Sequence, residues 1–345
     1  MSIRLSAAAV VIALLAAACG GDGDPYTPPN TPATAETATP ALPIPTATPQ
    51  PPATELRVAF INLLHPLTLD PEDVTADQTL DQRLASVIVE LQAFQPDIVA
   101  VVEASWTEEH GNVVQTLARE LRMEPLSARA NPWLPNYTDE ELLELAEQAG
   151  FWEGVAILAS SRYPILGWEQ HDVIPRPAAT ENRIVLHLVI RGPEQLGQID
   201  LYVTQLTSGD DESHSEQAAD VLAFVQETRG TGTAIVFGDL NELPDSQTVA
   251  TFTGDGIFVD ALGGLEPPLA GGTCCREAVV GEQAALEGRT SYVLTNGWLP
   301  GWASLFGEEP FPLPDGTLLY ASDHNGLLMT FPLEAVSGRA GGPPD

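Results

Sequence analysis

The chain has 345 residues, with 14 Lys and Arg against 48 Asp and Glu and a formal net charge of −34 at pH 7. All of the basic residues are arginines, because the sequence contains no lysine. Nucleic-acid affinity depends largely on cations that neutralise phosphates, so this composition argues against a nucleic-acid binder. Hydrophobic residues make up 44% of the chain, which suffices for the core of one large domain and excludes disorder throughout.

The first 19 residues have the features of an export signal. Arg4 precedes an apolar run over 5–15 that is too short to span a membrane as a stable anchor. Small residues then lead to Cys19, and this segment resembles the bacterial lipoprotein cleavage box. That resemblance implies a lipidated Cys19 and anchoring at the cell surface. An ordinary secretory signal cleaved after a small residue is the alternative, and both interpretations predict export.

The composition then divides the rest of the chain into three parts. Residues 20–55 are rich in Pro, Thr and Ala, which favours an extended polyproline II segment, and we interpret them as a stalk. Residues 336–345 are rich in Gly and Pro and are expected to form a loose tail. The folded domain is therefore expected over 56–335.

The domain begins with a pattern typical of a βαβ unit. Residues 57–63 predict a strand, 80–94 an amphipathic helix, and 97–103 a second strand that is almost entirely apolar. Burial of the central strands on both faces explains why the apolar residues do not alternate with polar ones.

Further elements follow along the chain. Thr138 and Glu141 predict a capping box that opens a helix ending near Gly150. Another helix is expected over 212–228. Strands are predicted near 154–160, 164–170, 183–190, 199–206, 233–238, 291–295 and 327–331. The domain is therefore of the α/β class and is expected to be a layered sandwich.

Polar residues stand at the ends of several predicted strands, where α/β folds usually carry their chemistry. These residues are Asn62, Glu103, Asp239, Asn241, Asp323 and His324. Asp239 and Asn241 are two positions apart, which places both side chains on one side of an extended chain. Each residue alone fits a turn or a solvated strand end equally well, so only the combination of these residues indicates a functional site.

Together and in this order, these residues resemble the motifs of the endonuclease/exonuclease/phosphatase superfamily, which has the fold of deoxyribonuclease I and neutral sphingomyelinase. The matching segments occur in chain order across the whole domain. They are Asn62 in the first strand, residues 95–98 followed by Glu103, residues 154–158 followed by 163–165, residues 238–241, and residues 322–324. In exported bacterial members, Gly-Thr-Cys-Cys precedes an Arg-Ile-Asp-Tyr-Val-Leu strand, and here 272–275 leads to 289–294. The resemblance implies a four-layer α/β/β/α sandwich.

The resemblance also implies metal-dependent phosphoester hydrolysis. Asn62 and Glu103 match the residues that hold Mg²⁺ in the family, with Mn²⁺ as the alternative ion. A hard cation prefers such carboxylate and amide oxygens. The metal would neutralise phosphate charge and stabilise the departing oxygen.

The other matching residues would handle water and phosphate. Asp239 and Asn241 would orient the attacking water and a phosphate oxygen. His324, with Asp323 beside it, would act as a base or as a cationic contact to phosphate; its structural alternative is a locally bonded histidine at a strand start. The remaining histidines are assigned local structural roles: His65, His110, His171, His187 and His214.

Two positions depart from the family pattern. Gln205 stands where the family has a leaving-group histidine, and it can hydrogen-bond the leaving oxygen but cannot donate a proton as an acid. Ser291 stands where the family has the aspartate that pairs with the strand-end histidine. Losing that partner would lower the pKa of His324 and leave its orientation less fixed. His214 is a candidate substitute acid.

Cys274 and Cys275 have no other partner in the chain if Cys19 carries lipid. They either pair with each other or stay free. Neighbouring Cα atoms lie ~3.8 Å apart, below the usual disulfide range, so a bridge between them would be strained. We expect the pair to be oxidised in an exported protein, as a rigid clip in its loop.

Two functions remain open at this point. The first is an exported Mg²⁺-dependent phosphodiesterase or phosphatase that acts as a monomer. Its substrate would be a small or lipid phosphoester, because the net charge disfavours binding of duplex DNA. The second is a catalytically degenerate binding domain on the same fold. The intact Glu103, Asp239, Asn241 and His324 favour the enzyme.

Overall fold

The computed structural model describes residues 54–66, 75–174, 182–208, 211–254, 256–265 and 268–333. The predicted export signal with Cys19, the stalk up to residue 53 and the tail over 336–345 lie outside these residues. Within the described part of the chain, no helix is both long and apolar enough to cross a membrane.

The first sheet contains seven strands in the order β12-β15-β1-β2-β5-β4, with β3 paired to β2. Their bounds are β1 (Glu55–Asn62), β2 (Ile98–Thr107), β3 (Gly111–Asn112), β4 (Met123–Asn131), β5 (Phe151–Ser160), β12 (Trp302–Phe306) and β15 (Gly326–Pro332). Only β1 and β2 pair in parallel, with Asn62 opposite Val102. This register sets the end of β1 beside the middle of β2, one residue before Glu103, because β2 continues to Thr107 and does not end at residue 103 as predicted.

The second sheet contains six strands in the order β10-β11-β9-β8-β7-β6. Their bounds are β6 (Ile165–Asp172), β7 (Ile184–Arg191), β8 (Gln198–Gln205), β9 (Thr233–Asp239), β10 (Val259–Asp260) and β11 (Ser291–Thr295). The parallel pair β8–β9 sets Gln205 opposite Asp239, and the antiparallel pair β9–β11 sets Ser291 opposite the same aspartate. A separate two-stranded ribbon joins β13 (Phe311–Pro312) to β14 (Leu318–Leu319).

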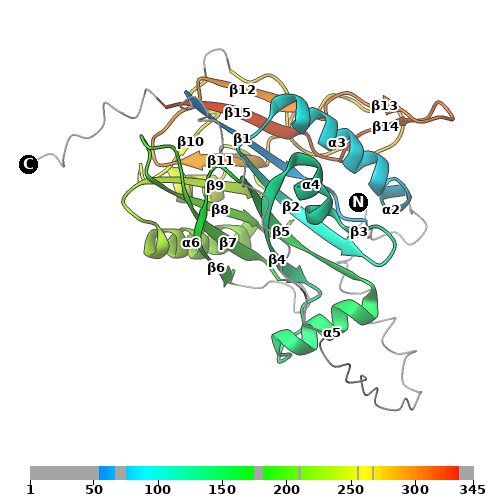
Figure 1. The fold of residues 1–345 in the computed structure, drawn as a ribbon, viewed down its shortest axis with the longest axis horizontal. Coiled ribbons are helices and arrows are strands. Elements are labelled where there is room, and N and C mark those ends of the chain that lie inside the picture. Colours follow the sequence, from blue (N-terminus) through cyan, green and yellow to red (C-terminus); the bar gives the residue numbers. More distant parts are fainter. Residues whose placement is uncertain are drawn as a thin grey trace, which may run out of the picture.

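The described helices are α2 (Thr75–Gln78), α3 (Leu80–Phe94), α4 (Val113–Leu121), α5 (Asp139–Ala149), α6 (Asp211–Thr228) and α7 (Gln247–Thr253). Helices α3 and α4 pack on the first sheet and α6 and α7 on the second, whereas α5 projects below the sheets in the view of Figure 1. One buried cluster fills the space between the sheets, a second packs α3 and α4 on the first sheet, and a third packs α6 and α7 on the second. The predicted four-layer α/β/β/α sandwich is therefore confirmed.

Most predicted elements are present near their predicted bounds. The helix over Leu80–Phe94 begins and ends as expected, and the capping box is present, since Thr138 Oγ1 accepts from the Glu141 N–H and Glu141 bonds back to the Thr138 N–H. The sequence analysis missed the helices α2, α4 and α7 and the strands β3, β4, β10, β12, β13 and β14. The strand β4 has no regular alternation of buried residues, which explains why the period-2 pattern did not reveal it.

Candidate active site

The candidate site lies where the two sheets meet, and Glu103 is placed there by an irregularity in β2. Pairing between β2 and β5 shifts register between Val102 and Ala104. Glu103 itself has φ 53°, in the left-handed region that non-glycine residues rarely adopt. A β-bulge of this kind redirects one side chain out of the regular alternation. It therefore turns the Glu103 carboxylate toward the end of β1 and the second sheet.

The amide of Asn62 links carboxylates from both sheets. Its Nδ2 donates to Glu103 Oε1 at 2.8 Å and to Asp239 Oδ2 at 3.0 Å. Its Oδ1 accepts from the Leu64 backbone N–H at 2.9 Å. Because Asn62 is buried at the end of β1, it fixes the spacing of two acidic groups that would otherwise repel each other.

Glu103 is surrounded by donors. Its Oε1 also accepts from Gln205 Nε2 at 2.9 Å, and its Oε2 accepts from the His65 backbone N–H at 3.0 Å, with His65 Nε2 at 3.8 Å. Burial raises the pKa of Glu103, but the His65 charge and the hydrogen bonds from Asn62, Gln205 and His65 outweigh it and lower the pKa to about 2. Glu103 is therefore ionised at neutral pH.

Gln205 lies between a carboxylate and a guanidinium. Its Nε2 faces Glu103, and its Oε1 accepts from Arg183 Nη1 at 3.1 Å. The two contacts fix which end of the amide faces which neighbour. Gln205 at the end of β8 is therefore a buried polar bridge between Arg183 and Glu103 of β2.

Asp239 and Asn241 follow different geometry from that expected. The strand β9 ends at Asp239, and Asn241 has φ 53°, so the alternation of an extended chain does not reach it. Asp239 Oδ1 accepts from the Asn241 N–H at 3.3 Å, while Asn241 Nδ2 donates to the Leu206 carbonyl at 2.7 Å. Asn241 thus ties the end of β9 to the end of β8.

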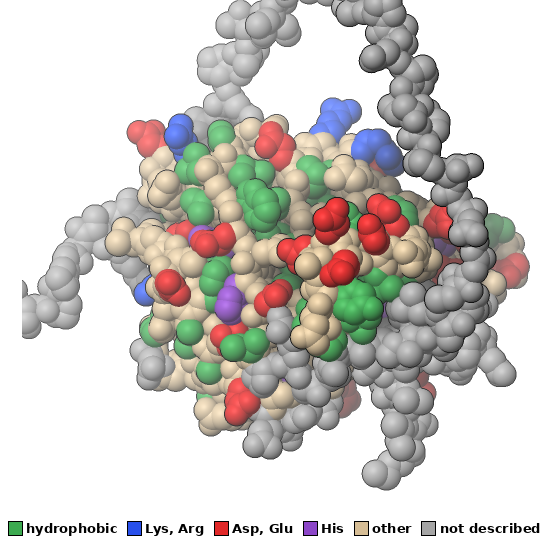
Figure 2. Space-filling model, turned by 90° about the horizontal axis from the view of Figure 1, so that it is seen from below, with side chains coloured by type: hydrophobic (Ala, Val, Ile, Leu, Met, Phe, Trp, Pro, Cys, Tyr) green, Lys and Arg blue, Asp and Glu red, His purple; other side chains and the backbone are tan. Residues whose placement is uncertain are grey.

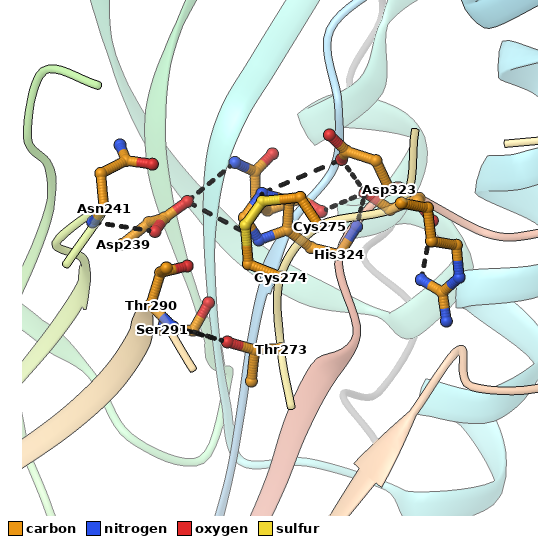
Figure 3. The surroundings of a disulfide bond; sticks show 12 residues. Asp239, Asn241, Thr273, Cys274, Cys275, Thr290, Ser291, Asp323 and His324 are labelled. Atoms are coloured by element: carbon orange, nitrogen blue, oxygen red, sulfur yellow. Dashed lines mark hydrogen bonds and ion pairs between the residues drawn. A yellow bond between two sulfur atoms is a disulfide. The ribbon is translucent and has the colours of Figure 1, made fainter. Parts of the chain in front are cut away.

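His324 enters the site from the segment before β15. Its Nδ1 lies 3.8 Å from Asp239 Oδ2, and its Nε2 lies 4.0 Å from Asp323 Oδ1 (Figure 3). Burial lowers the pKa of His324, but Asp323, Asp239 and Glu103 outweigh this and raise it. The pKa of Asp323 is raised as well, mainly by burial, although His324 opposes that shift. These three carboxylates therefore favour the charged form of the imidazole.

Two buried atoms near Asp239 lack hydrogen-bond partners. They are His324 Nδ1 and Ser291 Oγ. Ser291 lies directly across from Asp239 in the β9–β11 register. In the pattern that the sequence resembles, an aspartate stands at position 291 and pairs with the histidine. Here Ser291 replaces it, and His324 Nδ1 has no hydrogen-bond partner.

The cysteine pair packs against the same histidine. The structure joins Cys274 and Cys275 as a disulfide, and Cys275 Sγ lies 3.5 Å from His324 Nε2 (Figure 3). Thr273 just before it accepts the N–H groups of Thr290 and Ser291 through Oγ1. The pair is therefore part of the wall of the site; its oxidation state in solution stays a prediction.

Several residues that the sequence analysis left out support the site. Buried Arg83 donates to the carbonyls of Leu63 and Leu64 directly after Asn62, of Ala321 shortly before His324, and of Ala76 on α2. A charged residue on the apolar face of a helix was the available signal. His65 was assigned a local role, yet the structure places it beside Glu103.

His214 does not join this group. It is buried with Nδ1 2.7 Å from Glu242 Oε1, and its Nε2 contacts the Thr207 carbonyl. Both ring nitrogens are therefore engaged elsewhere, which argues against the idea that His214 is a substitute acid.

Comparison with known proteins gives a clear result at the level of structure. No family model and no curated protein sequence matches the chain. The fold is similar to an endonuclease/exonuclease/phosphatase family protein from Bacteroides thetaiotaomicron, with a TM-score of 0.62 and 14% identity over 81% of this chain and 95% of that one.

Two further solved structures are similar. A mannosyl-6-phosphatase from B. thetaiotaomicron has a TM-score of 0.60 and 14% identity over 80% of this chain and 99% of that one. The human Nocturnin catalytic domain with bound sulfate has a TM-score of 0.55 and 19% identity over 81% of this chain and 93% of that one. The chain therefore has the endonuclease/exonuclease/phosphatase fold, as its motifs predicted.

Proposed function

We propose that the protein is an exported, membrane-anchored phosphoester hydrolase that uses a divalent cation, with Mg²⁺ preferred and Mn²⁺ the alternative. The observation that carries the proposal is the convergence of Asn62, Glu103, Asp239 and His324 from both sheets on one buried site. Similar folds include a protein named as a sugar phosphatase, which supports the same class of chemistry. The sequence of residues 1–19 supports export and anchoring.

The residues present fit a hard divalent cation. Glu103, Asp239 and Asp323 bring three carboxylates close to one imidazole, so negative charge exceeds the positive charge that His324 supplies. Glu103 is ionised, and oxygen donors of this kind suit Mg²⁺. Asn62 would contribute its amide oxygen after rotation of the amide, since Oδ1 now accepts from Leu64. A bound cation would neutralise phosphate charge and stabilise the departing oxygen.

The side chains around the cation would then have separate roles in catalysis. Asp239 would orient a water molecule, because it is buried and held by Asn62 and by the Asn241 N–H. The raised pKa of His324 favours an imidazolium, which suits a contact to phosphate. Gln205 would donate its second Nε2 hydrogen to the leaving oxygen, since the first already reaches Glu103.

A small or lipid phosphoester is the preferred substrate class. The chain carries a net charge of −34, and acidic side chains outnumber basic ones on the face drawn in Figure 2. Such a surface repels the extended phosphate backbone of a duplex outside the site itself. We also propose that the protein acts as a monomer.

A catalytically degenerate binding domain is the second candidate. The specific observations in its favour are Gln205 at the position of the leaving-group acid and the His324 Nδ1 without a hydrogen-bond partner, in a site where Ser291 lies opposite Asp239. General acid–base help is worth ~10²–10⁴ in rate, so these changes would reduce turnover more than phosphate binding.

A metal-titrated assay on a generic phosphodiester and a phosphomonoester, run beside the Mg²⁺ affinity of the purified protein, tests the proposal. Metal-dependent turnover that Asp239→Ala abolishes is the expected result. Mg²⁺ binding with no turnover of either substrate would favour the binding domain. Neither binding nor turnover would contradict both candidates.

A further inference from the structure

A second cluster of ligating side chains lies outside the candidate active site. It comprises Asp77 on α2, Glu109 and His110 in the turn between β2 and β3, and Asp81 in the first turn of α3. One ligating atom each from Asp77, Glu109 and His110 lies within 4.8 Å of the other two. The hydrolase proposed above uses none of these residues.

His110 distinguishes this cluster from an ordinary group of surface carboxylates. Its side chain is only 8% exposed, although Asp77 and Asp81 beside it are open to solvent. Its Nε2 is buried without a hydrogen-bond partner, and Asp77 Oδ1 lies 3.4 Å from that nitrogen. A buried ring nitrogen without a hydrogen bond normally costs free energy, unless it serves a ligand.

The other ring nitrogen is held in place. His110 Nδ1 lies 3.3 Å from Asp81 Oδ1, a contact that favours the proton on Nδ1. The lone pair of the neutral ring then resides on Nε2, on the side of Asp77. A carboxylate that holds the far nitrogen of a metal-binding histidine is a recurrent arrangement in zinc sites, where it fixes the tautomer and the ring orientation.

We propose that Asp77, Glu109 and His110 bind a first-row divalent cation, with Zn²⁺ as the ion of choice and Asp81 as the positioning residue. One imidazole nitrogen with two carboxylates suits Zn²⁺ better than Mg²⁺, which prefers oxygen ligands alone. Three protein ligands leave a coordination position for water. Because Asp77 and Glu109 are accessible, the ion would exchange with the solvent.

Such an ion would fasten a short helix to the body of the domain. The helix α2 has four residues, so it cannot be stable by itself. Its contact with the rest of the fold includes Ala76, whose carbonyl accepts from Arg83 Nη2 at 2.9 Å. The same guanidinium donates to Leu63 and Leu64 beside Asn62. The ion would therefore stabilise a helix that shares Arg83 with the residues directly after Asn62.

The competing explanation is a protonated His110 that forms ion pairs with Asp77 and Asp81 and binds no metal. Calorimetric titration of Zn²⁺ into the non-reduced protein, with excess Mg²⁺ present to occupy the active site, separates the two. We expect one Zn²⁺ site in the wild type and an increase in melting temperature with Zn²⁺. Asp81→Asn should weaken that affinity ~10–100-fold.

His110→Gln should abolish binding, whereas His171→Gln is the matched control, since His171 pairs with Asp220 elsewhere and should leave Zn²⁺ affinity unchanged. If His110→Gln does not fold, Glu109→Gln on the exposed turn serves instead and should also weaken binding. Absence of a Zn²⁺ site in the wild type would overturn the proposal. Equal Zn²⁺ affinity of the wild type and the His110 or Glu109 variant would overturn it too.

Discussion

Gln205 donates through Nε2 to Oε1 of Glu103 at 2.9 Å, across the boundary between the two sheets. Its own Oε1 accepts from Arg183, so the amide connects a cation to the principal carboxylate of the site. A neutral amide satisfies both neighbours at once, because it has a donor and an acceptor at fixed positions. This glutamine therefore has a positioning role, whereas the motif resemblance indicates only that a histidine is absent at this position.

The first prediction concerns this bridge. Gln205→Leu keeps the volume but removes one hydrogen bond from each of Glu103 and Arg183, which should lower the free energy of unfolding by about 2 kcal/mol. Urea denaturation at neutral pH measures the change. Gln226→Leu on α6, at an exposed position, is the matched control and should have little effect. An unchanged stability of Gln205→Leu would contradict the structural role.

The same variant should also change the response to acid. The pKa of Glu103 is lowered to about 2 in the folded protein, below its ordinary value of 4.5. Ionised Glu103 therefore contributes stability that is present above the ordinary pKa and lost as the pH falls toward about 2. Removing one of its hydrogen bonds raises the folded pKa, so Gln205→Leu should lose less stability than the wild type between these limits.

Glu103 should be required for most of the increase in melting temperature that Mg²⁺ causes. Mg²⁺ should raise the melting temperature of the wild type by linkage and do much less for Glu103→Ala. Glu120→Ala on the exposed surface of α4 is the control and should respond like the wild type. Equal stabilisation of the wild type and Glu103→Ala in a differential scanning experiment would place the cation elsewhere.

Ser291→Asp should give His324 the partner it lacks. The new carboxylate would lie across from Asp239 in the β9–β11 register. If it bonds His324 Nδ1, which has no hydrogen-bond partner, the restored acid–base help should raise turnover ~10²-fold. Ser291→Asn is similar in size without the charge and should give a smaller gain. A folded Ser291→Asp protein with unchanged kcat would argue that this position does not limit turnover.

Arg83 should be essential for the stability of the site. Arg83→Met keeps most of the side-chain length but leaves the carbonyls of Leu63, Leu64, Ala76 and Ala321 without this donor. We expect a loss of about 3 kcal/mol in the free energy of unfolding, together with weaker Mg²⁺ binding. A stable Arg83→Met protein with normal Mg²⁺ affinity would show that other contacts hold this loop.

Cys274 and Cys275 should be oxidised to each other in freshly purified protein. Alkylation without reductant, followed by intact-mass measurement, should give no adduct at either residue, and adducts should appear after reduction. Two adducts before reduction would disprove the pairing.

The sequence was informative where a residue's role follows from its position on a strand. Apolar runs located the central strands. Asn62 and Glu103 proved to be neighbours because parallel pairing sets Asn62 opposite Val102, although Glu103 lies at a bulge inside β2 and not at its end. The contacts of Arg83, His65 and Gln205 depend on loops and on the packing of two sheets. No local pattern encodes these long-range contacts, so the sequence analysis either omitted these residues or assigned them other roles.

The strand β15 lies between β12 and β1, although it is the last strand of the domain and β1 is the first. His324 directly precedes it, and Ser322 Oγ bonds the Asn62 carbonyl of β1 at 2.8 Å. A nascent chain that has not yet released its final segment from the ribosome therefore has an open position beside β1 and no histidine at the site. Premature termination before Gly326 should yield an inactive and unstable product, so every active molecule has been translated through its last strand.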